Sequence, residues 1–221
     1  MGTAELMLGI SVCHLNDSVL LSQAHYIESL LNQYGMSDCQ PVVTPMIPNQ
    51  HLDKATEGDV VAFKNLNVNY QSAIGCLSYL STAARPEISF TVSSLLQFLE
   101  NSGIQNWNAF IHVLQYLKGT SSFCLMYQCH QEERVVAYSN ADWGNCRIIR
   151  RSTTGFVILM GNCLITWKTQ KQPTVCLSTS EAEYKALADL STEVLWLRQL
   201  IQDLNLMTIN GVLILKMEIA I

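Results

Sequence analysis

Three acidic side chains have the placement that metal chemistry needs. Asp142 follows a predicted strand over residues 134–139. Glu181 and Glu183 fall in the first turn of a predicted helix that begins after Ser178. A carboxylate at a strand end that faces another on a helix gathers the hard oxygen ligands that Mg²⁺ prefers. The same spacing also fits a structural interpretation, in which Glu181 completes a helix capping box and Asp142 forms a turn. Spacing alone leaves both interpretations open.

A basic segment is the second candidate site. Between Trp143 and Ser180 the sequence has no acidic residue and five basic ones, which are Arg147, Arg150, Arg151, Lys168 and Lys171. Such cations bind phosphates, and the indole rings of Trp143 and Trp167 offer stacking surfaces for bases. The alternative is a solvated hairpin rim, because five charges suffice for weak phosphate binding only.

The second half of the chain has the pattern of a mixed α/β layer. Apolar or alternating runs predict strands over residues 123–127, 134–139, 155–160, 163–167 and 211–221. Gly161 and Asn162 predict a two-residue hairpin turn. Ser178 and Glu181 have capping-box spacing and open a long helix, whose apolar stripe consists of Leu187, Leu190, Leu197, Ile201 and Leu204. Strands followed by a helix and a further strand indicate an α/β fold.

The first half is mainly helical. Apolar runs over residues 5–12 and 18–21 predict a strand pair, and a helix follows from Ser22 to Gly35. Three prolines predict a linker or surface loop over residues 41–67. Three more helices are expected, at residues 70–84, from Pro86 onward, and at residues 105–117, with apolar stripes that indicate core positions.

Composition narrows the function classes. Of the 221 residues only 14% are charged, compared with about 25% in an ordinary soluble protein, and 49% are hydrophobic. The net charge of -5 has the wrong sign for overall attraction to phosphates, so contact with nucleic acid must be local. The eight cysteines have no zinc-ligand spacing. Without a signal peptide or a long apolar run, we expect an intracellular protein, cytoplasmic or nuclear, with no membrane partner.

Several motifs resemble one known family. The ribonuclease H domain of copia-type (Ty1-copia) retrotransposon Pol polyproteins is similar to residues 152–156 (STTGF), 167–175 (WKTQKQPTV), 178–187 (STSEAEYKAL) and 195–198 (LWLR). The reverse transcriptase end and connecting segment of the same polyprotein are similar to residues 8–10 (LGI), 21–23 (LSQ), 79–88 (YLSTAARPEI) and 114–120 (LQYLKGT). The resemblance covers nearly the whole chain in the family's order.

This resemblance implies a division into three parts. Residues 1–46 would be the end of the reverse transcriptase, with its palm or thumb remnant, and residues 47–130 a helical connection segment. Residues 131–221 would be a truncated ribonuclease H-like domain, a mixed sheet with a long helix. In such a domain the apolar strand 212–219 would lie near a sheet edge, so we expect the isolated chain to aggregate.

The resemblance also implies site residues. Family members cleave the RNA strand of an RNA-DNA hybrid with paired Mg²⁺ ions, which clustered carboxylates must hold. The family's first acid corresponds to Asn140 here, and the second is retained as Glu183, with Glu181 as the fallback. The third corresponds to Lys216, and Asp142 is the candidate substitute.

The charges at these site positions then favour a degenerate fragment without nuclease activity. One unit charge interacts with another at about 4 Å by roughly 4 kcal/mol at an effective dielectric near 20, so the loss of one acid and the gain of a cation should remove most Mg²⁺ affinity. No cofactor is expected to bind well. The implied partners are an RNA-DNA hybrid, bound weakly, and the rest of the polyprotein. The alternatives are a non-catalytic nucleic-acid-binding module that uses residues 147–171, and a residual nuclease that uses Asp142 and Glu183.

Overall fold

A computed structural model divides the chain into two compact units, residues 1–126 and 127–221. It describes residues 5–48, 52–129, 134–146, 149–206 and 211–216. Each unit has its own apolar core, so each is described by itself.

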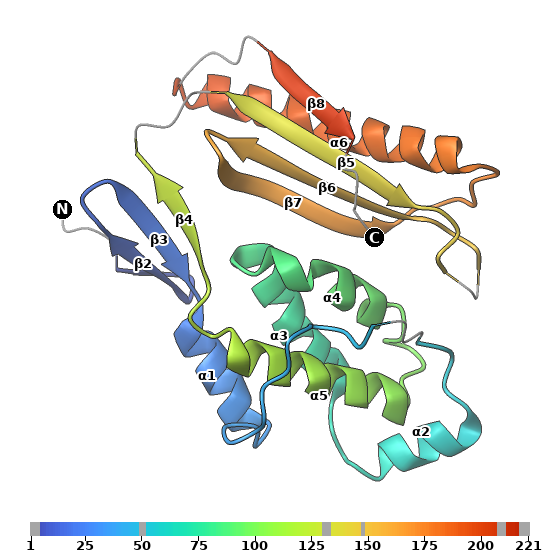
Figure 1. Ribbon diagram of the computed structural model, residues 1–221. Coiled ribbons are helices and arrows are strands. Elements are labelled where there is room, and N and C mark those ends of the chain that lie inside the picture. Colours follow the sequence, from blue (N-terminus) through green and yellow to red (C-terminus); the bar gives the residue numbers. More distant parts are fainter. Residues whose placement is uncertain (1–4, 49–51, 130–133, 147–148, 207–210, 217–221) are drawn as a thin grey trace. The chain divides into compact units, whose positions relative to one another are not determined.

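The first unit begins with a small sheet (Figure 1). Strands β1 (Leu6–Met7), β2 (Ile10–His14) and β3 (Ser18–Ser22) pair antiparallel, and β4 (Cys124–Gln128) completes the order β1-β2-β3-β4. The predicted strand over residues 5–12 is therefore interrupted. Leu8 and Gly9 have positive φ angles, as a two-residue hairpin turn requires.

Helices make up the rest of this unit. They are α1 (Ala24–Gln33), α2 (Glu57–Lys64), α3 (Tyr70–Ala83), α4 (Ser89–Leu96) and α5 (Ile104–Gly119), with a 3₁₀ turn η1 (Pro86–Ile88) before α4. Four of the predicted helices are confirmed. Gly35 follows α1 with a φ of 66°, the left-handed conformation that ends many helices. The helix predicted from Pro86 begins as a 3₁₀ turn and becomes α-helical only at Ser89.

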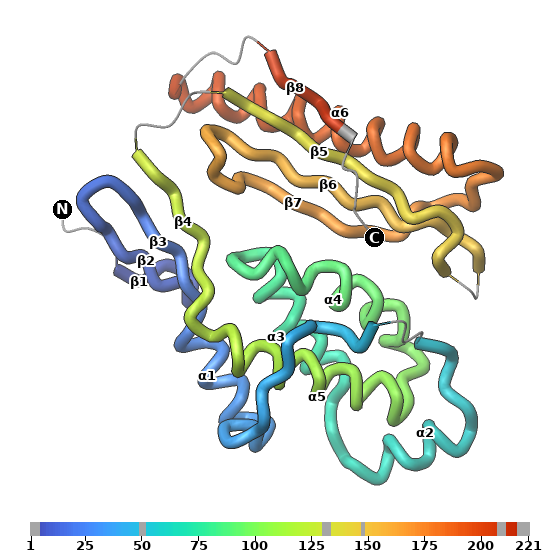
Figure 2. Tube along the Cα trace, in the orientation of Figure 1, coloured from blue at the N-terminus to red at the C-terminus, as the bar shows by residue number. Residues whose placement is uncertain are grey.

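The prediction of a linker over residues 41–67 is wrong in part, because α2 lies within it (Figure 2). Thr56 and Asp59 cap its start reciprocally: the Asp59 amide donates to Thr56 Oγ1 at 3.3 Å, and the Thr56 amide to Asp59 Oδ2 at 3.1 Å. Phe63 is the buried residue of this helix. Such a short apolar stripe gives too little helical periodicity to be recognised, whereas the capping pair was a usable signal.

The core of the first unit is formed where α1, α3, α4 and α5 meet. Its fully buried side chains include Ile27, Ile74, Leu77, Leu80, Leu95, Phe110, Leu114 and Leu117. The predicted apolar stripes lie in this core, apart from Phe90 of α4, which is 45% exposed. Helix α1 shares this core with α5, so one compact unit contains residues on both sides of position 46, where the first predicted domain boundary lies. The three domain assignments implied by the family resemblance stay predictions.

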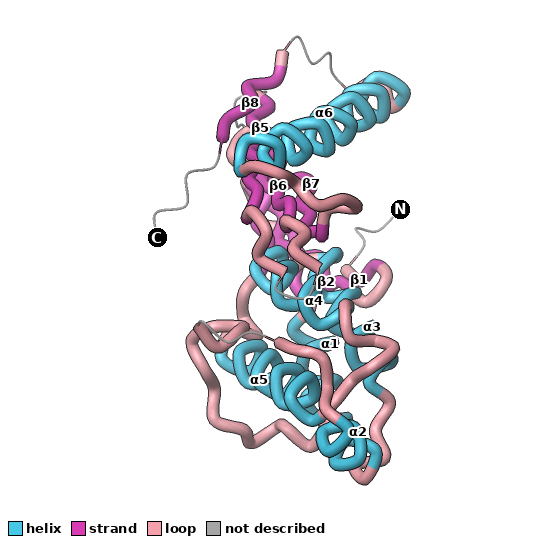
Figure 3. The backbone as a smooth tube through the Cα atoms, turned by 90° about the vertical axis from the view of Figure 1, so that its right-hand side faces the viewer, coloured by secondary structure: helices cyan, strands magenta, loops and turns pink. Residues whose placement is uncertain are grey.

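The second unit is a mixed sheet covered on one face by a long helix (Figure 3). Strands β5 (Val135–Asp142), β6 (Thr153–Met160) and β7 (Cys163–Lys171) pair antiparallel, and β8 (Val212–Lys216) pairs parallel to β5, in the order β7-β6-β5-β8. The covering helix is α6 (Thr179–Asp203). Gly161 and Asn162 have φ angles of 55° and 63°, which confirms the predicted two-residue turn between β6 and β7.

Side chains alternate between the two faces of this sheet. Val135 and Ala137 of β5 point toward α6 and pack with Phe156, Ile158, Leu190, Leu197 and Ile201. The mixed sheet with a long helix is the α/β fold that we predicted. In the described part of the sheet β8 is an edge strand, with Leu213, Ile214 and Leu215 partly exposed. The expected aggregation of the isolated chain stays a prediction.

Candidate functional site

A groove of about 640 Å³ lies where α6 begins, beside the carboxyl ends of the parallel strands β5 and β8. The described residues that line it are Ser139, Thr179, Ser180, Glu183, Tyr184, Leu187, Ser191, Ile214 and Leu215. Ligands of open α/β sheets characteristically bind outside the carboxyl ends of the strands. The position of this groove therefore makes it the candidate site.

The start of α6 is fixed by its own sequence. Ser178 is the N-cap, and its side chain accepts a hydrogen bond from the Glu181 amide at 3.1 Å. Ala182 and Ala186 are fully buried, and their small side chains bring the first turns close to the sheet. Glu183 follows Ala182 directly and lies at the flank of the helix that faces the groove.

Glu183 is the one acidic side chain among the described residues of the groove. The residue that we assigned as the retained second acid therefore does lie in the cavity at the strand ends. The other groove residues of α6 are hydroxyl or apolar residues: Thr179, Ser180, Tyr184, Leu187 and Ser191. Thr179, Ser180 and Leu187 lie three or four positions from Glu183, so helical spacing in the sequence would have identified these three.

Glu181, the fallback acid, is held elsewhere. Its Oε1 accepts a hydrogen bond from Lys185 Nζ at 2.7 Å, and its Oε2 accepts one from the Leu177 amide at 2.7 Å. These bonds, the one from Lys185 foremost, hold the pKa of Glu181 below its ordinary value. The predicted capping box is corrected in one detail, because the carboxylate reaches the amide of Leu177 and not that of Ser178. Glu181 thus stabilises the helix start.

Asn140 lies at the same end of the sheet but outside the wall of the groove. Ser139 is a wall residue, and successive strand residues point to opposite faces, so Asn140 points away from α6. Its Oδ1 accepts a hydrogen bond from the Ala141 amide at 2.9 Å. The described pairing between β5 and β8 ends at Ser139 and Lys216, so Asn140 is the next β5 residue along this edge.

Asp142 and Lys216 complete the set of predicted site residues. Asp142 ends β5, is exposed, and shares with Asn140 the face that points away from α6. The backbone of Lys216 lies opposite Ser139, whereas its side chain is outside the part that the structure describes. The structure therefore gathers Glu183 and the backbones of residues 140 and 216 at one sheet edge, and places Asp142 two residues beyond it.

Across the described residues, no group of three or more His, Cys, Asp or Glu side chains is arranged to hold a metal ion. Two Mg²⁺ ions require several carboxylates in one place. The donors of the groove, one carboxylate and neutral hydroxyl groups, do not fit a pair of such ions.

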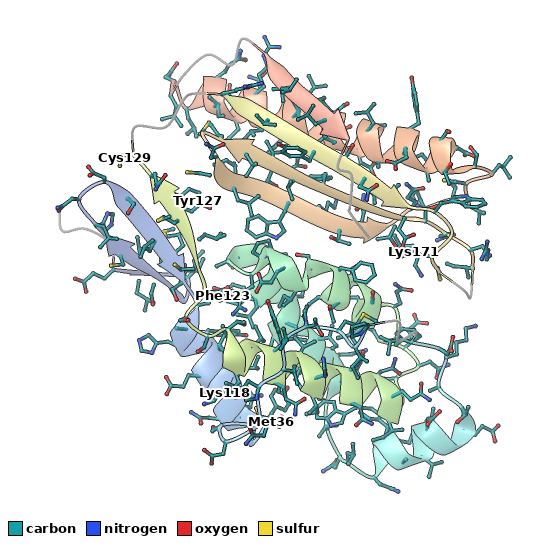
Figure 4. The ribbon with its side chains drawn as sticks, in the orientation of Figure 1. Met36, Lys118, Phe123, Tyr127, Cys129 and Lys171 are labelled. Carbon is teal, nitrogen blue, oxygen red and sulfur yellow. The ribbon has the colours of Figure 1, made fainter. Side chains whose placement is uncertain are left out.

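The predicted basic segment is divided by the register of β7. Lys168 pairs with Phe156, whose side chain packs toward α6, so Lys168 points to the helix-covered face. Lys171 is three residues later and points to the other face, at the carboxyl end of β7 (Figure 4). Its Nζ lies 2.9 Å from Cys146 Sγ. The two lysines therefore cannot act as one patch, because an odd spacing along a strand separates faces.

Arg150 and Arg151 belong to the segment between β5 and β6. Arg150 is exposed and has a φ of 55°, and Arg151 is partly exposed. Arg147 lies outside the described residues. The carboxyl ends of β5 and β7 and the start of β6 are at the same end of the sheet, so Arg150, Arg151 and Lys171 share the groove's end of the unit.

Comparison with known proteins gives relatives for nearly the whole chain. It is 34% identical over 210 residues to the retrovirus-related Pol polyprotein from transposon TNT 1-94 of Nicotiana tabacum, covering 93% of this chain and 16% of that protein. An uncharacterized mitochondrial protein of Arabidopsis thaliana is 34% identical over 198 residues, covering 89% and 79% of the two chains. The retrovirus-related Pol polyprotein from transposon RE1 of Arabidopsis thaliana is 32% identical over 199 residues, covering 90% and 13%.

The chain thus spans less than a fifth of the length of the TNT 1-94 and RE1 polyproteins. No family model and no solved structure matches it. Within the described residues, no helix is both long enough and apolar enough to cross a membrane.

Proposed function

Because this chain belongs to the retrovirus-related Pol polyproteins of copia-type retrotransposons, we propose that residues 127–221 form a ribonuclease H-type module that no longer cleaves RNA. The observation that carries this proposal is the composition of the groove. It has the position of a ligand site in an open α/β sheet, and Glu183 is the one acid among its described lining residues.

Electrostatics supports the loss of hydrolysis. Asn140 keeps an oxygen atom but carries no charge, and the sequence brings a lysine to position 216 at the same sheet edge. Each unit charge gained or lost within about 4 Å of a metal site changes the interaction by roughly 4 kcal/mol per metal charge at an effective dielectric near 20. A single carboxylate is therefore too little to hold paired Mg²⁺ ions at millimolar concentration.

A gain-of-function series tests this proposal. The unaltered chain should not cut an RNA-DNA hybrid in Mg²⁺ or Mn²⁺, whereas Asn140→Asp combined with Lys216→Asp should restore cleavage, because it returns two carboxylates to the sheet edge beside Glu183 once the side chain at position 140 leaves the Ala141 amide and turns to that edge. Adding Glu183→Gln to that double variant should abolish it again. Asn162→Asp is the matched control, because it makes the same chemical change in the β6–β7 turn, at the opposite end of the sheet. Cleavage by the unaltered chain that is lost on Glu183→Gln would refute the proposal.

Nucleic-acid binding without hydrolysis is the second candidate function. It is favoured by the placement of Arg150, Arg151 and Lys171 at the groove's end of the sheet, although the whole chain is acidic. Phosphate contacts by a few cations give weak binding that falls steeply with salt.

Fluorescence anisotropy with a labelled hybrid tests this second function. Arg150→Ala with Arg151→Ala should weaken binding and reduce the slope of log affinity against log salt by about 1 to 2. Arg198→Ala, an exposed arginine in the later turns of α6, is the control that should change neither quantity. Equal losses in both variants would show that the basic segment has no special part in binding.

A further inference from the structure

One buried amide side chain joins three elements around the start of α6. Gln172, directly after β7, has no solvent exposure. Its Nε2 donates to Thr154 Oγ1 of β6 at 2.9 Å and to the carbonyl oxygen of Ala182 of α6 at 2.8 Å, and its Oε1 accepts from Cys176 Sγ at 2.8 Å. We call these four residues the Gln172 cluster.

The chemistry of the partners fixes the orientation of this amide. The Ala182 carbonyl can only accept, so the nitrogen of Gln172 and not its oxygen must face α6. The oxygen then faces the Cys176 thiol, which can donate. All three bonds are satisfied together in a dry site, where a lost partner leaves a buried polar group without compensation.

Further contacts tie the loop between β7 and α6 to this cluster. Lys185 Nζ donates to Thr174 Oγ1 at 2.9 Å and lies 3.3 Å from Cys176 Sγ. Trp143 Nε1, after β5, donates to the carbonyl oxygen of Cys176 at 3.0 Å. The loop is therefore held by β6, by α6 and by the segment that follows β5.

From this arrangement we infer that Gln172 is the positioning residue of the groove: it sets the place of the first turns of α6 on the sheet and thereby the place of the Glu183 carboxylate. Ala182 immediately precedes Glu183, so a shift of the Ala182 carbonyl moves the Glu183 backbone with it. The far half of α6 has a different attachment, through the apolar side chains of Leu197 and Ile201. Loss of the amide should therefore loosen one end of the helix only.

This inference uses the proposed function only to name Glu183 as the acid of the groove. The test compares Gln172→Met with Gln170→Met, which removes the same kind of side chain two residues earlier, within β7. The Gln170 side chain donates to Asp189 Oδ2 at 3.0 Å, a single partly buried bond farther along α6. Methionine keeps the length of the side chain in both variants and removes its hydrogen bonds.

Hydrogen exchange and nuclear Overhauser effects give the readout. In Gln172→Met the amides of residues 182–187 should exchange about tenfold faster, while those of residues 197–203 stay unchanged, because the three buried hydrogen bonds of the Gln172 side chain are lost at one end of the helix. Any nuclear Overhauser contacts between the methyl groups of Leu187 and Ile214, which both line the groove, should weaken. Gln170→Met should leave the exchange of residues 182–187 and these methyl contacts as they are.

A third variant supplies a pH profile that a merely structural residue would not give. Gln172→Glu keeps the shape of the side chain, and its protonated form can donate one hydrogen bond to the Ala182 carbonyl, whereas its ionised form can donate none. After correction for the intrinsic pH dependence of amide exchange, the protection of residues 182–187 should therefore be high at low pH and fall as the introduced carboxyl group ionises. The unaltered chain should lack this pH-dependent step.

Function is tested separately in the Asn140→Asp, Lys216→Asp background. There Gln172→Met should weaken Mn²⁺ binding about tenfold, and Gln170→Met should not. Uniformly faster exchange along the whole of α6, or no change at all, would overturn the positioning role. Absence of Mn²⁺ binding in the background variant itself would overturn the proposed function, while the exchange data still decide the role of Gln172.

Discussion

The two units hold their helices in different ways. In the first unit aromatic rings meet at the core: Phe110 lies 4.9 Å from Tyr34 and 4.8 Å from Trp107 between ring centroids. In the second unit α6 has apolar contacts along its middle and far turns, but its first turn depends on a hydrogen bond that Gln172 donates to the Ala182 carbonyl and one that Ser178 accepts from the Glu181 amide. An apolar core loses stability in proportion to the atoms removed, whereas a buried polar junction fails when one partner is missing.

Buried polar groups alone do not mark the site, as the first unit shows. Arg85 is 1% exposed and donates to Glu87 Oε1 at 2.6 Å, and it also bonds Thr120. Its guanidinium lies over the rings of Tyr116 and Phe123. This bridge joins η1 to the end of α5, and Arg85 is not among the described residues that line the groove at the start of α6. The difference from Gln172 is location, because Gln172 adjoins the helix turn that bears Glu183.

The largest effect is expected in the aromatic core. Phe110→Ala should lower the free energy of unfolding of the first unit by about 3–5 kcal/mol, since a fully buried phenyl ring is removed and a cavity remains. Urea unfolding followed by circular dichroism measures it. Phe90→Ala, at a half-exposed position of α4, is the control, with an expected loss below about 1 kcal/mol. Equal losses would show that Phe110 is not a core residue.

The corresponding change in the second unit should have a somewhat smaller effect. Leu190→Ala removes a fully buried side chain beneath the centre of α6 and should cost about 2–4 kcal/mol. Leu195→Ala, at an exposed position on the same helix, should cost less than about 1 kcal/mol. Because the two cores are separate, the losses of Phe110→Ala and Leu190→Ala should add in the double variant. A clear departure from additivity would mean that the units share a core.

Sequence patterns predicted the elements wherever local signals were strong. The helix α1, which ends before Gly35, and the Gly161–Asn162 turn each depend on a few neighbouring residues, and each was found where expected. Helix α2 was not predicted, because Phe63 is its one buried residue and gives no repeating apolar stripe. Local information is thus sufficient for capped, amphipathic helices and short turns.

The site was harder to predict because it depends on pairing between distant segments. No local motif specifies the register in which β8 pairs parallel to β5. This register also places Ser139 in the same groove wall as Glu183. The division of Lys168 from Lys171 also requires the register of β7. The position of Glu183 was predicted from its motif, whereas Gln172, although it lies in the motif at residues 167–175, was not singled out, because burial of a glutamine cannot be read from its neighbours in sequence.

A comparison of N-cap substitutions tests the polar start of α6, with smaller expected effects on stability than the core substitutions. Ser178→Ala should destabilise the second unit by about 1 kcal/mol, because the Glu181 amide loses its acceptor. Thr56→Ala removes the equivalent cap of α2 in the first unit and should cost a similar amount there. Thr192→Ala, on the exposed side of α6, serves as the control and should be neutral or slightly stabilising. Differential scanning calorimetry of the three variants distinguishes a capping effect from a change in helix propensity.

The smallest effect is expected from the exposed pair Glu181 and Lys185, and its sign follows from their pKa values. The hydrogen bond between the two side chains lowers the pKa of Glu181 from 4.5 and raises the pKa of Lys185 from 10.5. The contribution of Glu181 is present above pH 4.5 and is lost as pH falls through its lowered pKa. The contribution of Lys185 is present below pH 10.5 and is lost as pH rises through its raised pKa.

Lys185→Met should therefore reduce stability slightly at neutral pH. It should also flatten the acid limb, which is the fall in stability below pH 4.5, with little effect at high salt. Thermal unfolding of this variant and of Lys118→Met, an equivalent change at the end of α5, across pH 2–8 measures the difference. An acid limb that is as steep in Lys185→Met as in the unaltered chain would show that this ion pair does not secure the start of α6.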